Sequence, residues 1–228
     1  MKNKTKLKGL FITGTDTDVG KTYIGVQIVS TLYQSRIKLQ PRKPIESGCQ
    51  LIEGTLHPDD ANQYFHAVNE SISLDDICPY RFEPPISPQR AARLVNQPIS
   101  VEKAHQACIK NISSEDFLVA EGAGGFYSPL CEDGLNADLA KALQLPVLLI
   151  ANDQLGCINH ILLTMEAIQK RNLEINAVVL NGKNQTHDAA MNNADDLKAL
   201  VEVPVFSVGK DERLNSESSL IQHILKST

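Results

Sequence analysis

One stretch constrains the fold more than any other: residues 14–22, with the sequence Gly-Thr-Asp-Thr-Asp-Val-Gly-Lys-Thr. An apolar run, residues 9–12, precedes it, and a helix-like run, residues 23–29, follows it. A strand, a glycine-bounded loop, a Lys-Thr pair and a helix, in this order, are the arrangement that binds a nucleoside triphosphate. The sequence therefore predicts a phosphate-binding loop between the first strand and the first helix.

Each part of this loop has an expected role. Lys21 is expected to place a positive charge at the outer phosphates, and Thr22 to offer its hydroxyl to magnesium. The loop is one residue longer than the usual pattern, and Thr15 stands where its first glycine is usual. An ordinary strand-to-helix turn that carries a lysine is the alternative interpretation. The backbone groups expected to surround the phosphates belong to Asp18, Val19, Gly20, Lys21, Thr22 and Tyr23.

Composition narrows the class of protein. The chain has 228 residues, of which 42% are hydrophobic and 21% charged, which is typical of a soluble globular protein. Its net charge is −5 and it has no basic block, so neither nucleic acid nor an anionic membrane is an expected partner. No apolar run is long enough to span a bilayer. The five cysteines form no Cys-x-x-Cys pair, which argues against zinc and disulfides and favours reduced thiols in the cytoplasm.

Strand-like and helix-like runs alternate along the whole chain. This alternation predicts an α/β fold of the P-loop NTPase type, with a mostly parallel sheet and helices on both faces, in one domain over residues 1–228. The segments 49–58 and 79–88 are expected to be irregular, the second because it contains four prolines. The expected strands are 9–12, 37–40, 116–120, 145–150, 175–180 and 204–208. The expected helices begin near residues 22, 59, 89, 101, 136, 155, 187 and 220.

A second basic loop follows the second expected strand. Residues 41–48 contain two prolines and a glycine, which predicts a loop, and they include Lys43 and Ser47. Ligands of open α/β sheets lie beyond the carboxyl ends of the strands. Lys43 and Ser47 are therefore expected to face the same crevice as Lys21, although a lysine in such a loop can also simply be solvated.

Two acids are candidates for a magnesium site. Asp60 lies at an expected helix start, where an acid can instead serve as a helix cap. Glu121 ends a short apolar strand, the usual position of the second acid of a phosphate-loop site, where it binds magnesium or its water. The small residues Gly122, Ala123 and Gly124 come next and let the backbone approach a phosphate closely.

With these residues placed, the chain resembles the dethiobiotin synthetase family, enzymes of biotin synthesis. The resemblance covers most of the chain and rests on five segments in the family's order. These segments are residues 14–22, 43–48 (Lys-Pro-Ile-Glu-Ser-Gly), 80–88, 121–125 (Glu-Gly-Ala-Gly-Gly) and 155–160 (Leu-Gly-Cys-Ile-Asn-His).

The resemblance implies an ATP-dependent cyclo-ligase that forms C–N bonds. One amine of diaminopelargonate captures CO2 as a carbamate, and a carbamate oxygen attacks the γ-phosphate of ATP. The second amine then closes the cyclic urea and expels phosphate, which gives dethiobiotin, ADP and phosphate. Two repelling anions must meet in this reaction, and Lys21, Lys43 and Mg2+ are expected to neutralise them.

Individual roles also follow from the resemblance. Lys43 corresponds to the active-site lysine, and Thr17 and Ser47 correspond to residues that contact the substrate. Asn181 lies where the family contacts the adenine base. The positions that match the magnesium ligands are Thr22, Asp60 and Glu121.

The resemblance further implies a homodimer. In the family, the carboxylate at the tail of the substrate rests on the start of a helix from the neighbouring subunit, which suits an anion. Gly156, Cys157 and Asn159 match that helix start, whereas His160 nearby is expected to be structural.

This chain departs from the family pattern at four places. Asp18 stands where glutamate is common, Arg42 where an aromatic residue is common, and Gln89 where histidine is common. No aromatic residue occurs near 192–193, where a tyrosine can contact the substrate carboxylate.

Two other classes of protein remain as alternatives. One is a nucleotide-switch binding module akin to the partitioning ATPases, which favour a lysine near the start of the loop, where this chain has Thr15 and Asp16. The other is a relative of the cobyrinate amidases or of cytidine-nucleotide synthetase. Those enzymes need a glutamine-hydrolysing domain, for which no room is expected after residue 210.

Overall fold

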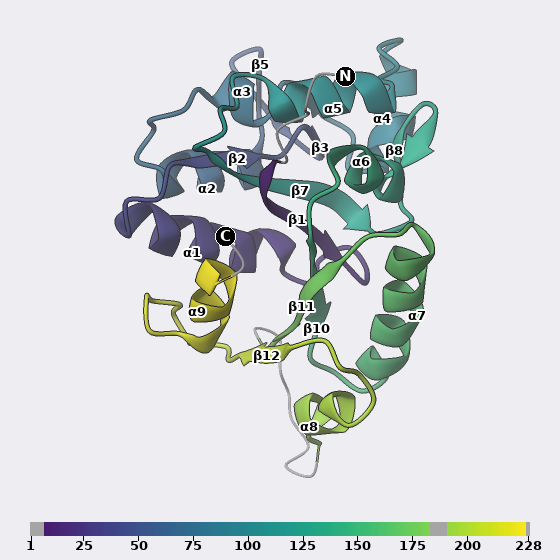
Figure 1. Cartoon of the computed structure of the whole chain (residues 1–228). Helices are drawn as coiled ribbons and strands as arrows, with labels where there is room; N and C mark the ends of the chain where they lie inside the picture. The colour runs from purple at the N-terminus through teal and green to yellow at the C-terminus, as the bar shows by residue number, and fades with distance from the viewer. Residues whose placement is uncertain (1–6, 183–190, 227–228) are drawn as a thin grey trace, which may run out of the picture.

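Six apolar runs of the chain form the strands of one parallel sheet in the computed structural model, which describes residues 7–182 and 191–226. Every pair of neighbouring strands is parallel, as predicted, and each of the six overlaps a predicted strand. Figure 1 shows the sheet running through the middle of the molecule. Its order is β12 (Val205–Val208), β11 (Ile175–Asn181), β10 (Val147–Asn152), β1 (Lys8–Gly14), β7 (Phe117–Gly125) and β2 (Leu39–Arg42).

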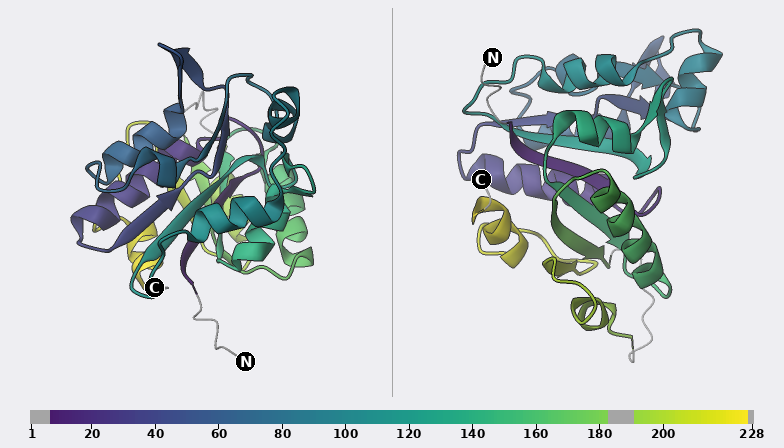
Figure 2. Two further views of the ribbon diagram at one scale, coloured as in Figure 1. Left: turned by 90° about the horizontal axis from the view of Figure 1, so that it is seen from above. Right: turned by 45° about the vertical axis from the view of Figure 1, so that its right-hand side comes forward.

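Helices cover both faces of this sheet (Figures 1 and 2). One face carries α1 (Lys21–Gln34), α2 (Asp59–Ala67), α3 (Leu74–Ile77) and α9 (Ser219–Lys226). The other face carries α4 (Pro88–Leu94), α5 (Val101–Ile109), α6 (Asn136–Leu143), α7 (Cys157–Lys170) and α8 (Asn193–Lys198). The helix that was predicted over 187–200 is present as α8. Residues 187–190 of that prediction lie outside the described part of the chain.

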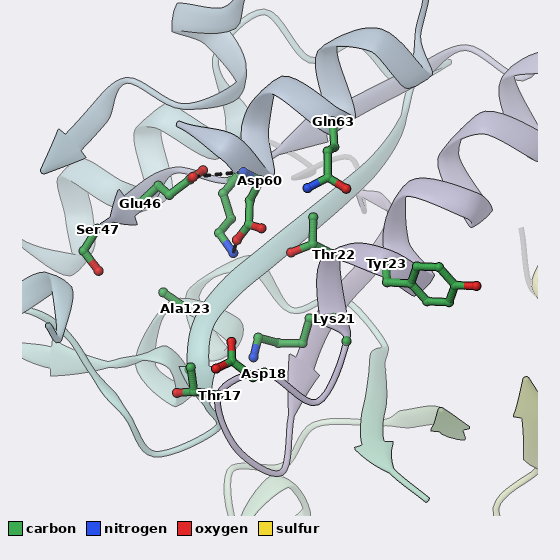
Figure 3. Close-up of a pocket in the computed structure, with 13 residues that line it drawn as sticks. Thr17, Asp18, Lys21, Thr22, Tyr23, Glu46, Ser47, Asp60, Gln63 and Ala123 are labelled. Atoms are coloured by element: carbon green, nitrogen blue, oxygen red, sulfur yellow. Dashed lines mark hydrogen bonds and ion pairs between the residues drawn. The ribbon is translucent and has the colours of Figure 1, made fainter. Parts of the chain in front are cut away.

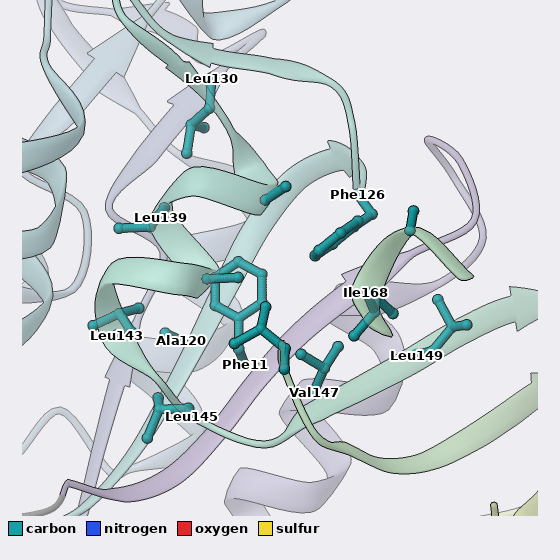
Figure 4. Packing of buried hydrophobic residues seen from close by; sticks show 14 of the residues in the cluster. Phe11, Ala120, Phe126, Leu130, Leu139, Leu143, Leu145, Val147, Leu149 and Ile168 are labelled. Atoms are coloured by element: carbon teal, nitrogen blue, oxygen red, sulfur yellow. The ribbon is translucent and has the colours of Figure 1, made fainter. Parts of the chain in front are cut away.

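The core consists of two apolar clusters, one on each face of the sheet. Successive side chains of a strand point to opposite faces. Phe11 and Leu149 accordingly belong to the cluster under α4 to α8, whereas Ile12 and Leu148 belong to the cluster under α1, α2, α3 and α9. Figure 4 shows Phe11 at the centre of the first cluster. Because both faces are covered, the central strands are apolar throughout, as their sequences indicated.

Two segments that were predicted to be irregular contain short strands. Residues 49–58 include an antiparallel hairpin, β4 (Gln50–Ile52) and β5 (Thr55–His57). All three residues of β4 are exposed, so no alternation of apolar and polar residues marked it in the sequence. The proline-rich segment contributes β6 (Tyr80–Phe82), which pairs in parallel with β3 (Ile45–Ser47) in the loop after β2. The loop that carries Lys43 is thus held by a two-stranded sheet.

Boundaries also differ from the prediction at two strands. β2 covers residues 39–42 instead of 37–40, because the end of α1 continues through a left-handed Arg36 and a bond from Ile37 N–H to Leu32 C=O. β7 extends to Gly125, five residues beyond the predicted end. A third short pair, β8 (Pro129–Cys131) and β9 (Gly134–Leu135), follows it. Within the described residues, no helix is both long and apolar enough to cross a membrane.

Candidate active site

The predicted functional loops meet at the carboxyl edge of the sheet. Lys21 follows β1, Lys43 follows β2, and Glu121 lies in β7 directly beside Ile12 of β1. A pocket of about 500 Å³ opens at this edge and is lined by both lysines. That volume lies within the usual range of small-molecule sites, about 300–1,000 Å³. The two ammonium groups are therefore brought to one cavity, as the sequence predicted.

The loop after β1 provides one wall of the pocket. Gly20, just before α1, has a φ of 91°, and an added Cβ would lie 1.9 Å from the Asn181 amide nitrogen. The conformation and the crowding both require glycine here. Figure 3 shows Lys21 pointing into the pocket and Tyr23 pointing away from it. The predicted residues of this loop that line the pocket are Thr17, Asp18, Gly20, Lys21, Thr22 and Tyr23.

Lys43 is the most strongly paired cation of the site. Its Nζ lies 2.8 Å from Asp60 Oδ2 and 2.5 Å from Glu121 Oε1, and its side chain is almost completely buried. Burial by itself would lower the pKa of Lys43, but the carboxylates of Glu121 and Asp60 raise it above the ordinary lysine value. Lys43 therefore stays charged, and it is not the solvated lysine that the loop alone would have allowed.

Lys21 has the opposite electrostatic character. Its Nζ donates to the backbone carbonyl of Asp16 at 2.9 Å. Burial, and next the nearby charge of Lys43, lower the pKa of Lys21 to about 8. A bound triphosphate would supply the negative charge that this lysine lacks in the free protein.

Glu121 lies below the pocket and connects three elements. Its Oε1 accepts hydrogen bonds from Lys43 and from Thr22 Oγ1 at 2.8 Å, and its Oε2 accepts one from Tyr64 Oη at 2.6 Å. The side chain is fully buried. Because α1, α2 and the loop after β2 all contact this one carboxylate, Glu121 fixes their relative positions.

The donor chemistry of this site fits magnesium. Asp60 and Glu121 offer carboxylate oxygens and Thr22 a hydroxyl, and these are the ligands that Mg2+ prefers. No cluster of three or more His, Cys, Asp or Glu side chains that could hold a metal occurs among the described residues. In nucleotide-type magnesium sites, one or two carboxylates act together with phosphates and water.

The small residues after Glu121 form the floor of the pocket. In β7, residues 121–125 lie opposite only residues 12–14 of β1, so the strand bulges, and Ala123 and Gly124 line the pocket. Buried Asn136 holds the bulge. Its Oδ1 accepts from Ala123 N–H at 2.9 Å, and its Nδ2 donates to carbonyls of residues 123, 125 and 128.

The other predicted site residues fall into two groups. Ser47 and Asp60 line the pocket, as do Lys43, Ala123 and Gly124. Asp59, the neighbouring acid, instead accepts from Gln50 Nε2 at 3.3 Å near the surface. The predicted residues that are not among those lining the pocket are Val19, Glu121, Gly122, Asn181, Gly156, Cys157 and Asn159.

Asn181 has a clear structural contact. It is 1% exposed, and its Nδ2 donates to the carbonyl of Val19 at 3.0 Å, so it supports the loop from behind. Its contact with adenine stays a prediction. Gly156, Cys157 and Asn159 lie at the start of α7, where Cys157 is buried and Asn159 is exposed. Their contact with a substrate carboxylate also stays a prediction.

Three residues of the site were not predicted. Glu46 and Gln63 line the pocket, and Tyr64 contacts Glu121 beneath it. Gln63 and Tyr64 follow Asp60 by three and four residues on α2, so helical spacing from Asp60 could have indicated them. Glu46 was inside the quoted loop motif, but its partners are backbone groups of α2, which no sequence pattern reveals.

Three departures from the family pattern have structural explanations. Arg42 is buried and donates to carbonyls of Pro41 and Lys110. Gln89 donates to the carbonyl of Cys131 at 2.9 Å. Asn193 donates to Asp153 at 2.7 Å, just ahead of α7. Each of these side chains thus joins segments of the fold.

The fold and the site together define a class of protein. A parallel sheet with helices on both faces, and a glycine-bounded loop that presents Lys21 and Thr22 to a pocket, make this chain a P-loop NTPase-like protein. A septum site-determining protein MinD complexed with Mg-ADP, from Pyrococcus horikoshii OT3, matches it with a TM-score of 0.53 at 14% identity, over 97% of this chain and 94% of that one. A cell division ATPase MinD from Pyrococcus furiosus matches with a TM-score of 0.52 at 17% identity, over 97% of each chain. These likenesses show the fold alone.

Sequence comparison identifies the family within this class. The family model described as an AAA domain matches residues 8–217. An ATP-dependent dethiobiotin synthetase from Vesicomyosocius okutanii subsp. Calyptogena okutanii (strain HA) is 40% identical over 175 residues, which cover 77% of this chain and 79% of the relative. Another from Ruthia magnifica subsp. Calyptogena magnifica is 34% identical over 219 residues, 96% of this chain and 99% of the relative. The chain belongs to the ATP-dependent dethiobiotin synthetase family.

Proposed function

We propose that this protein is an ATP-dependent dethiobiotin synthetase, a cyclo-ligase that converts diaminopelargonate, CO2 and ATP to dethiobiotin, ADP and phosphate in biotin synthesis. Its family supports this assignment. The observation that carries it at the level of chemistry is that Lys21 and Lys43, from separate loops, line one pocket with Thr22. Such a pair of cations suits the meeting of two anions, a carbamate and a triphosphate.

The geometry suggests a different role for each of the two lysines. Lys21, at the start of α1 and with a lowered pKa, suits the phosphates that the loop surrounds. Lys43 stays charged because of its two carboxylates, so it can attract the carbamate and stabilise charge that moves onto the transferred phosphoryl group. Thr17 is exposed and Ser47 half-buried at the pocket, where they can orient the diamine.

Thr22, Asp60 and Glu121 would hold magnesium. When bound, Mg2+ supplies charge neutralisation to the phosphate oxygens. Lys43 contacts both carboxylates, so Asp60 and Glu121 would hold the Lys43 ammonium as well as the metal.

A homodimer completes the proposed site. Gly156, Cys157 and Asn159 are not among the residues that line the pocket of their own chain. In a dimer, the start of α7 from a second copy would receive the tail carboxylate of the substrate, since free N–H groups at a helix start favour an anion. We also propose a cytoplasmic location, which the five free and buried cysteines support.

The nucleotide-switch alternative has less support. It rests on likeness to the MinD structures, which extends to the fold alone. Partner-stimulated ATP hydrolysis that is indifferent to diamine would favour it.

One incubation tests the proposal. Purified protein with diaminopelargonate, bicarbonate, Mg2+ and ATP should form dethiobiotin, detected by mass, and ADP in equal amount. Lys43→Ala should cut turnover about a hundredfold or more while nucleotide binding stays largely intact, because transition-state charge stabilisation is lost. Lys103→Ala, at an exposed site on α5, is the matched control. Absence of dethiobiotin from the wild-type reaction would refute the proposal.

A further inference from the structure

Tyr64 is a completely buried tyrosine whose hydroxyl reaches the candidate active site. It lies on α2 one turn after Asp60, and its ring belongs to the apolar cluster under α1. Its Oη donates to Glu121 Oε2 at 2.6 Å. The other oxygen of the same carboxylate accepts from Thr22 and Lys43. Tyr64 thus contacts an acid that joins the phosphate loop to the active-site lysine.

The neighbouring helix makes room for this hydroxyl. Gly25 lies in the second turn of α1, a position where alanine is favoured over glycine by helix propensity. A Cβ added at Gly25 would lie 2.0 Å from Tyr64 Oη and 3.1 Å from its Cζ. Glycine at position 25 therefore leaves free the space that the Tyr64 hydroxyl occupies.

We propose that Tyr64 is a positioning residue for Glu121, and that Gly25 is the space that permits it. The inference deepens the proposed function and rests on it, because it concerns the same site. A carboxylate whose Oε2 is fixed by Tyr64 cannot turn both oxygens onto Lys43. Oε1 is then held towards Thr22 and Lys43, and the ammonium of Lys43 stays shared between Glu121 and Asp60.

The hydroxyl can be separated from the packing of the ring. Tyr64→Phe removes only the hydrogen bond and keeps the buried ring, so a role in packing alone predicts a normal site. Tyr33→Phe is the matched control, since Tyr33 packs against the same apolar cluster from α1 and is not among the residues lining the pocket.

The test measures magnesium dependence as well as turnover. Tyr64→Phe should lower kcat and the apparent affinity for Mg2+ by about tenfold, as expected for loss of a hydrogen bond that orients a metal ligand. Calorimetric titration should show metal-free ATP affinity within about twofold of wild type, because the phosphate loop is intact. Tyr33→Phe should match the wild type in every measurement. Wild-type kcat and Mg2+ dependence in Tyr64→Phe would overturn the inference, even if its melting temperature falls.

Gly25→Ala provides a second, independent variant. It should reproduce the Mg2+ defect of Tyr64→Phe, because the new methyl group displaces the hydroxyl. The double variant should be no worse than Gly25→Ala alone, since the two changes break one contact. If the Mg2+ defects of the two single variants add fully in the double variant, the two changes do not act through one contact, and the inference is overturned. If the wild-type protein forms no dethiobiotin, the proposed function fails, while the comparison of Mg2+-dependent and metal-free ATP binding still tests Tyr64.

Discussion

Glu46 accepts hydrogen bonds from the first turn of α2, beside Asp60. One of its carboxylate oxygens accepts the backbone N–H of Asp60 at 2.9 Å (Figure 3). The other accepts the backbone N–H of Ala61 at 3.0 Å. The residue before the helix is Pro58, whose side chain has no hydrogen-bonding group, so Glu46 takes the place of a helix cap from a distant loop. It thereby sets the position from which Asp60 reaches Lys43.

Replacing Glu46 should therefore affect both stability and activity. Glu46→Ala is expected to lower the free energy of unfolding by about 2 kcal/mol, since two N–H groups at a helix start lose their hydrogen-bond acceptor. Turnover should fall because Asp60 is less well fixed, and Glu46→Gln, which keeps one acceptor, should be intermediate. Urea unfolding and dethiobiotin formation measure the two effects. Glu83→Ala, at an exposed site, is the control, and equal stability of Glu46→Ala and this control would refute the capping role.

Lys21 should make the protein less stable at neutral pH than a neutral side chain would. Burial, then Lys43, lower its pKa to about 8 in the folded protein, against 10.5 for an ordinary lysine. Between these two pH values the unfolded chain binds more protons, so the free energy of unfolding rises with pH in that window. Below about pH 8, Lys21 is charged in the folded protein, and the destabilisation from burying this charge is fully present.

Lys21→Met removes the buried positive charge and the destabilisation that it causes. It is expected to raise the free energy of unfolding at pH 7 by on the order of 1–3 kcal/mol, with a smaller gain at pH 9.5. ATP affinity should fall at least about tenfold in the same variant, because the phosphates lose a cation. Chemical denaturation at the two pH values and calorimetric titration with ATP are the measurements. A variant that is less stable than wild type at pH 7, or that binds ATP normally, would contradict this account.

The sequence predicted the sheet and the main contacts of the pocket because both follow from local patterns. Apolar runs marked all six strands, and the rule that ligands lie at carboxyl ends brought Lys21 and Lys43 together. The same rule put Glu121 at this edge, although as a buried residue beneath the cavity.

Contacts between distant elements could not be predicted in this way. Helical spacing places Tyr64 on the same side of α2 as Asp60, but no sequence pattern shows that it packs against Gly25 or that its hydroxyl reaches Glu121. Glu46 acts on the backbone of α2, and backbone groups carry no sequence signal. The pairing of β3 with β6 joins strands of three residues, too short for a periodic pattern.

Asn136 should be essential for the floor of the pocket. Its amide holds the bulge of β7 through a backbone N–H and backbone carbonyls of three residues, in contacts that are buried or partly buried. Asn136→Ala is expected to lower the free energy of unfolding by about 3 kcal/mol, because several buried polar groups lose their partner. Asn136→Asp should cost at least as much, since its carboxylate would face those carbonyls. Urea unfolding measures both, and a loss below about 1 kcal/mol in each would contradict the role.

Asn181 offers a test that separates support of the loop from recognition of the base. Its donated bond to the Val19 carbonyl predicts that Asn181→Ala weakens ATP and GTP binding by the same factor, about three- to tenfold, since a hydrogen bond that shapes the loop is lost. Direct contact with adenine, which the family resemblance implies, predicts instead that the preference for ATP over GTP changes. We expect equal losses, because the side chain is 1% exposed and lies behind the loop. Calorimetric titration of the wild type and the variant with both nucleotides measures the ratio, and a change of more than about fivefold in that ratio would assign Asn181 to the base.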